Sequence, residues 1–67
     1  MTSTRIDTAE FLKFLAEAAE NESRLEAETP MSKSLLRMLK NGYQPGETMA
    51  KAINVTIAEI RNRKVAG

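Results

Sequence analysis

The stretch Met49–Ile60, written MAKAINVTIAEI, decides the fold of this 67-residue chain, because it can form one continuous helix or two short ones. Asn54 favours a break, since asparagine adopts the left-handed conformation that ends a helix more readily than other non-glycine residues. Thr56 and Glu59 then have the spacing of a capping box, which marks a helix start. The pattern therefore predicts that one helix ends at Asn54 and a second begins at Thr56.

The apolar residues of this stretch leave an alternative open. Two further features favour the break. Val55 and Ile60 flank the capping box as a hydrophobic staple. Residues 55–57 are all β-branched, which is mildly unfavourable inside a helix. A continuous helix, however, would place five residues on one line: Met49, Ile53, Ile57, Ile60 and Lys64. We expect the break, with one unbroken helix from Pro45 onward as the alternative.

Residues 8–27 are predicted to form an acidic amphipathic helix. Asp7 can cap the amide of Glu10, and Ile6 with Phe11 forms a staple around this box. Apolar residues then recur at three- and four-residue spacing: Phe11, Leu12, Phe14, Leu15, Ala18 and Ala19. The sequence does not decide whether the polar part beyond Glu20 continues the helix or frays.

Residues 30–65 are predicted to form a basic helical core. Thr29-Pro30 supplies a threonine cap and a proline suited to the first helical position, and Asn41-Gly42 supplies a helix end. Pro45 starts a third helix that runs to Ile53, before the break at Asn54. The chain is thus expected to be a single domain, residues 1–67, with an all-α fold: a small bundle of about four short helices with a helix-turn-helix-like pair near the C-terminus.

The composition sets limits on the chemistry. Hydrophobic residues make up 42% of the chain but aromatics only 4%, which favours packed helices over a sheet. Without cysteine or histidine, the chain has no disulfide, no thiolate-metal site and none of the commonest metal ligand. No long apolar run or signal pattern is present, so we expect a soluble cytoplasmic protein that requires no cofactor.

Charge is divided unevenly along the chain. Residues 1–30 contain three basic and seven acidic residues, whereas residues 31–67 contain seven basic and two acidic ones. Such asymmetry is typical of a nucleic-acid-facing part joined to an acidic part, although ordinary solvated helix faces give the same pattern.

With the break in place, residues 46–65 resemble a helix-turn-helix DNA-binding unit. Ala50 matches the small residue between the two helices, and Asn54 stands where the motif usually has glycine. The inward residues of the motif are matched by Met49, Ile53, Val55 and Ile60. The chain departs from the motif at Arg63, where another apolar residue is usual, which puts the end of the second helix in doubt.

The second helix of such a pair would read bases in a major groove. The expected base-reading residues are Thr56, Ile57, Ala58, Arg61 and Asn62, and the expected phosphate contacts are Lys33, Lys40, Lys51, Arg63 and Lys64. We expect a homodimer that binds duplex DNA as a transcriptional or replication regulator. Its subunits would pair through the apolar stripe of Phe11, Phe14 and Leu15.

Catalysis finds no support in the sequence, because there is no histidine or cysteine and no evident base beside any serine. The alternative to a DNA-binding protein is a small helical protein-binding module, an inhibitor or assembly factor that docks an amphipathic helix on a protein partner. Its acidic half would bind a basic surface of the partner or imitate the negative charge of nucleic acid. An adaptable apolar contact would come from Met31, Met38 and Met49.

Overall fold

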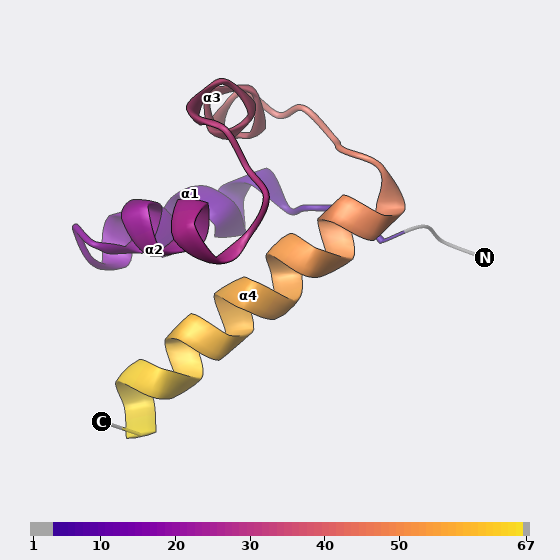
Figure 1. Ribbon diagram of the computed structural model, residues 1–67. Coiled ribbons are helices and arrows are strands. Elements are labelled where there is room, and N and C mark those ends of the chain that lie inside the picture. The colour runs from indigo at the N-terminus through magenta and orange to yellow at the C-terminus, as the bar shows by residue number, and fades with distance from the viewer. Residues whose placement is uncertain (1–3, 67) are drawn as a thin grey trace.

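The computed structural model describes residues 4–66, with side chains as far as Arg63, and these residues form helices and no strands. The four helices are α1 (Thr8–Glu17), α2 (Asn21–Glu28), α3 (Lys33–Lys40) and α4 (Glu47–Ala66). In Figure 1, α4 runs along one side of the molecule, α1 and α2 lie beside it, and α3 lies across the top. Helix α2 packs against both α4 and α1, and α1 also contacts α3. The predicted all-α bundle is confirmed.

Local signals correctly predict two of the helix ends. Asp7 caps α1, because its carboxylate accepts a hydrogen bond of 3.1 Å from the amide of Glu10. Gly42 follows α3 with a φ of 96°, which is the left-handed conformation predicted for the end of that helix.

The predicted helix over residues 8–27 is wrong, because the chain turns between α1 and α2. Ala18 is extended, and the side-chain amide of the buried Asn21 donates a hydrogen bond of 2.7 Å to the carbonyl of Phe14. This bond satisfies a carbonyl that the end of α1 leaves without a helical partner. The turn redirects α2 so that Leu25, which is fully buried, reaches the core.

The predicted start of the second helix at Thr29-Pro30 is also wrong. The hydroxyl of Thr29 donates to the carbonyl of Leu25 at 2.6 Å, so this residue closes α2. Ser32 caps α3 instead and accepts a hydrogen bond of 3.1 Å from the amide of Leu35. Met31 lies in the short connection between the helices and is buried.

Helix α4 is continuous from Glu47 to Ala66, so the predicted break at Asn54 is wrong and the helix-turn-helix-like pair is absent. No described residue other than Gly42 has a positive φ. The amide side chain of Asn54 donates instead to the carbonyl of Arg5 at 3.2 Å. Although α4 is 20 residues long, no helix among residues 4–66 is apolar over enough of its length to cross a membrane.

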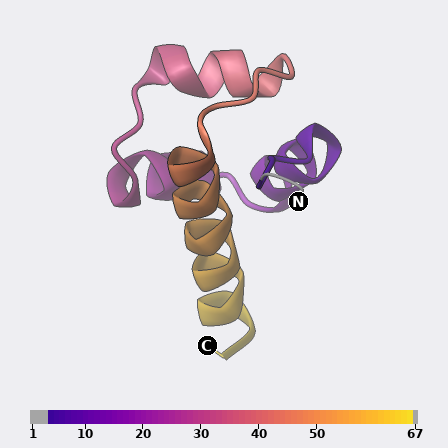
Figure 2. The same ribbon diagram turned by 90° about the vertical axis from the view of Figure 1, so that its right-hand side faces the viewer.

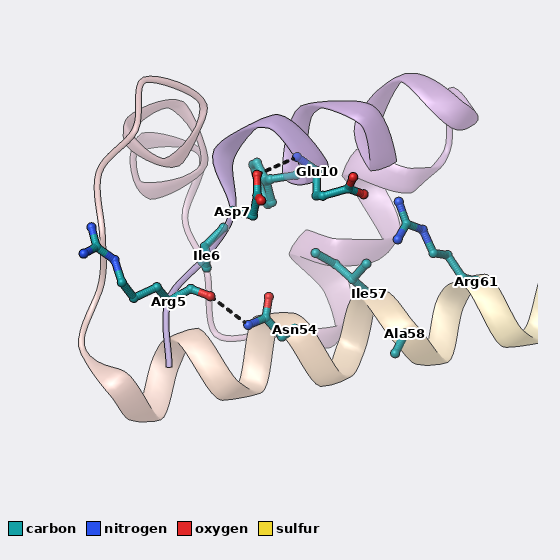
Figure 3. A pocket seen from close by; sticks show the side chains of 9 residues that line it. Arg5, Ile6, Asp7, Glu10, Asn54, Ile57, Ala58 and Arg61 are labelled. Carbon is teal, nitrogen blue, oxygen red and sulfur yellow. Dashed lines mark hydrogen bonds between the residues drawn. The ribbon is translucent and has the colours of Figure 1, made fainter. Parts of the chain in front are cut away.

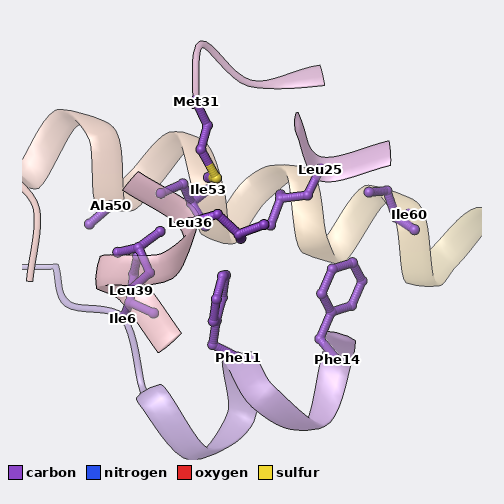
Figure 4. Close-up of a cluster of buried hydrophobic side chains, with 10 residues drawn as sticks. All are labelled: Ile6, Phe11, Phe14, Leu25, Met31, Leu36, Leu39, Ala50, Ile53 and Ile60. Carbon is purple, nitrogen blue, oxygen red and sulfur yellow. The ribbon is translucent and has the colours of Figure 1, made fainter. Parts of the chain in front are cut away.

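One core holds the four helices together. Figure 4 shows Ile53 and Ile60 of α4 facing Phe11 and Phe14 of α1, with Leu25 of α2 between them. The rest of the cluster consists of Ile6, Met31, Leu36, Leu39 and Ala50. Each helix therefore contributes apolar side chains to a single cluster, and α4 contributes along most of its length.

The core position of Phe14 gives the first prediction. Phe14→Ala should lower the free energy of unfolding by about 3–5 kcal/mol, because truncating a fully buried aromatic side chain leaves a cavity. Urea unfolding followed by circular dichroism measures this change. Leu12→Ala is the matched control on the same helix: Leu12 is 43% exposed, and its truncation should change stability by less than about 0.5 kcal/mol. Equal losses in the two variants would contradict the packing described.

Candidate nucleic-acid interface

The continuous helix changes the position of the residues expected to read bases. Thr56 lies in the interior of α4 and is buried, and its hydroxyl donates to the carbonyl of Ala52 at 2.8 Å. Ile57 is partly buried and packs against the core. The backbone amides near Thr56 are therefore not the free amides of a helix start, and this part of α4 has no helix N-terminus that could hold a phosphate.

Arg61 is held against α1. Its guanidinium donates to both carboxylate oxygens of Glu17, at 3.2 and 3.1 Å, and lies 5.5 Å from the ring centroid of Phe14. A bidentate pair and a cation–π contact together fix the side chain across the α1–α4 contact. Arg61 therefore stabilises the fold, and base contact would require it to leave Glu17.

Only two of the five expected base-reading residues are exposed without a described side-chain partner. These are Ala58 and Asn62, which lie on the outer face of α4. They lie four residues apart, so they are neighbours along the helix surface. Their expected role in base reading stays a prediction.

Several residues expected to contact phosphates have acidic partners in the fold. Lys40 pairs with Glu22 at 2.8 Å, and Lys51 pairs with Glu47 one helical turn away at 3.2 Å. Arg63 pairs with Glu28. Two of these pairs, Lys40–Glu22 and Arg63–Glu28, join the basic half of the sequence to the acidic half, as the pair of Arg61 and Glu17 does. The side chain of Lys64 lies outside the described part of the chain.

The hydrogen bond to Glu28, with the charges of Glu28 and Glu59, raises the pKa of Arg63 above its ordinary value.

The outer face of α3 carries basic side chains, two of which have no ion-pair partner among the described residues. These are Lys33 and Arg37, which lie one turn apart and are exposed. Lys40, one turn further on, continues this face, and α3 contains no acidic residue. We call Lys33, Arg37 and Lys40 the α3 basic face.

Polar and aromatic side chains border the α3 basic face. Ser34 and Asn41 are exposed beside the cations. Tyr43 is 45% exposed, and its amide donates to the carbonyl of Met38 at 3.0 Å, which holds it beside the end of α3. The face thus combines three cations with hydrogen-bonding groups of the kinds that contact phosphates and sugars. The phosphate contacts expected from the sequence did not include Arg37, although its four-residue spacing from Lys33 is visible there.

The stripe expected to pair two subunits is not available on the surface. Phe11 and Phe14 are buried in the core of one chain, and Leu15 packs against that core. The amphipathic face of α1 is therefore buried within one chain, which corrects the expected dimer contact. Of the three methionines expected to form an adaptable contact, Met31 is buried and Met49 packs against the core, so only Met38 is exposed.

A cavity of about 300 Å³ lies between the segment before α1 and the middle of α4. Figure 3 shows two hydrogen bonds at its wall: Asp7 accepts from the amide of Glu10, and Asn54 donates to the carbonyl of Arg5. The guanidinium of Arg61, at the other end, is bound to Glu17. The cavity offers no converging set of free polar groups, so we do not assign it a ligand.

The Arg61–Glu17 pair gives the second prediction. Arg61→Ala, Glu17→Ala and the double variant should show a coupling free energy of about 0.2–1 kcal/mol, because the two side chains are more than one third exposed and water screens their attraction. Urea unfolding of the four proteins measures it. The pair Arg61→Ala and Glu47→Ala is the control and should show no coupling, since these residues lie 14 residues apart on α4, about 21 Å along its axis. A coupling of zero for Arg61 and Glu17 would contradict the described contact.

Comparison with known protein families, with curated proteins and with solved structures finds no match to this chain. The function is therefore argued from the arrangement of its own residues. The surface that stands out in that arrangement is the α3 basic face.

Proposed function

We propose that this protein binds duplex DNA through the α3 basic face and acts as a small regulator of transcription or replication. The observation that carries the proposal is the pair of free cations, Lys33 and Arg37, on a helix without acidic residues. DNA presents closely spaced phosphates, and binding of such cations releases the counterions condensed around them.

The position of Lys33 supports the proposal that it binds an external anion. It is the first residue of α3, where the helix dipole favours negative rather than positive side chains. The cation therefore does not stabilise its own helix, and no described carboxylate compensates it. A phosphate group at this end of α3 would interact favourably with Lys33 and with the helix dipole.

Lys40 would change partners on binding. Its ammonium group is bound to Glu22 at 2.8 Å, but both side chains are partly exposed, so the pair contributes little to stability. A phosphate can replace Glu22 with little loss. Together with Lys33 and Arg37, Lys40 would then give three phosphate contacts on one helix face.

This mode of binding differs from groove reading by a separate recognition helix. The proposed contacts are made to the phosphate backbone, which carries no direct sequence information. We therefore propose binding with weak sequence preference and strong dependence on salt, and Ser34, Asn41 and Tyr43 as the neighbouring groups that orient the contact.

Titration of a fluorescently labelled random-sequence DNA duplex, followed by anisotropy at several salt concentrations, tests this proposal. Affinity should fall steeply as salt rises. The double variant Lys33→Ala/Arg37→Ala should weaken binding and lower the slope of log affinity against log salt by about 2, one unit for each lost phosphate contact.

The matched control is Lys13→Ala/Arg24→Ala, which removes the same charge from exposed, unpaired cations of α1 and α2. It should change the slope much less, because these residues lie among the acidic side chains of the first half. Equal effects of the two double variants would show that only net charge matters. Either that outcome or the absence of binding at low salt would overturn the proposal.

A further inference from the structure

The middle of the outer face of α4 lacks the charges that a solvent-exposed helix face usually carries. Residues 52–58 contain no charged side chain, and Val55, near the middle of the helix, is 57% exposed. Ala52 and Ala58 are exposed on either side of it. In Figure 2, α4 runs down the view, and no other described helix lies in front of it.

Charged and polar residues frame this apolar centre in a symmetric order. Lys51 and Glu59 lie four residues before and after Val55, and Thr48 and Asn62 lie seven residues before and after it. All four are exposed and lie within about half a turn of one another around the helix. The groups before Val55 are therefore complementary to the groups at the same distance after it: Lys51 to Glu59, and Thr48 to Asn62.

We propose that a second copy of the chain binds this face, with the two α4 helices antiparallel and a two-fold axis beside Val55. In that arrangement a residue before Val55 in one copy lies beside the residue at the same distance after Val55 in the other copy. Lys51 of each copy faces Glu59 of the other, which gives two interchain pairs of opposite charge from one contact.

The remaining residues of the face fit the same arrangement. The small side chains of Ala52 and Ala58 allow the two helix backbones to approach, so that Lys51 and Glu59 can reach across them. Thr48 of one copy lies level with Asn62 of the other, and a hydroxyl and an amide can exchange hydrogen bonds. A parallel pair would instead place Lys51 beside Lys51 and Glu59 beside Glu59. Charge thus selects the antiparallel orientation.

The contact involves one helix from each copy, so it belongs to the class of small interfaces that bury less than about 1,200 Å². We expect a reversible dimer with a dissociation constant above about 1 µM, since a small interface leaves little binding energy after the loss of translational and rotational freedom. This surface is separate from the α3 basic face, and the dimer requires no DNA.

Sedimentation equilibrium of the full chain without DNA, from about 10 µM to about 1 mM, tests the proposal. The wild-type chain should shift from monomer to dimer over this range. Val55→Asp should stay monomeric, because two carboxylates would meet at the axis. Leu12→Asp is the matched control, an exposed leucine on α1 replaced in the same way, and should dimerise like the wild type. Circular dichroism checks that both variants fold.

An exchange of charges tests the orientation. Lys51→Glu and Glu59→Lys, each studied alone, should weaken self-association at least about tenfold, because each brings like charges together. An equimolar mixture of these two variants should associate, since every interchain pair then has opposite charges. The double variant Lys51→Glu/Glu59→Lys should likewise recover the dimer.

A wild-type chain that stays monomeric at the highest concentration would overturn the proposal, as would a dimer that survives Val55→Asp. A dimer that Val55→Asp disrupts but that the mixed charge variants do not restore would overturn the antiparallel orientation. None of these outcomes depends on whether the chain binds DNA, so the two proposals fail separately.

Discussion

The continuity of α4 is the constraint on which the rest of the structure depends. Ile53 and Ile60 lie two turns apart on one side of the helix, and the aromatic residues of α1 pack on that side with Leu25 of α2. A break between the two isoleucines would point them in different directions and divide the core. In a chain of 67 residues there is little other apolar surface to compensate, because small domains bury a smaller fraction of their surface.

The sequence predicted the fold class and several local ends, but the distribution of residues among helices required tertiary information. Asp7 and Gly42 act locally, so their roles could be read from their neighbours. The turn after α1 could not, since Ala18 and Ala19 favour a helix and the turn is stabilised by Asn21. Thr56 was ambiguous, because a threonine hydroxyl can cap a helix start or bond to the carbonyl four residues earlier inside a helix.

The ion pairs around the candidate site could likewise not be predicted from the sequence alone. The sequence correctly indicated an acidic half and a basic half, but not which cations the fold would neutralise. Arg61 and Glu17 are 44 residues apart, and Lys40 and Glu22 are 18 apart, so no local pattern predicts these pairs. The α3 basic face becomes visible only after this pairing is known. The two surfaces proposed to bind partners are that face and the outer side of α4, and neither belongs to the core.

Nuclear magnetic resonance of the labelled chain tests the continuity of α4 most directly. Helical Cα chemical shifts and sequential amide–amide contacts should run without interruption from Glu47 through Asn62, including Asn54 and Val55. Non-helical shifts at Asn54 and Val55, with a renewed helical series beginning after Thr56, would contradict the account. Such a result would show two helices separated by a turn and would restore the groove-reading arrangement in place of the one described.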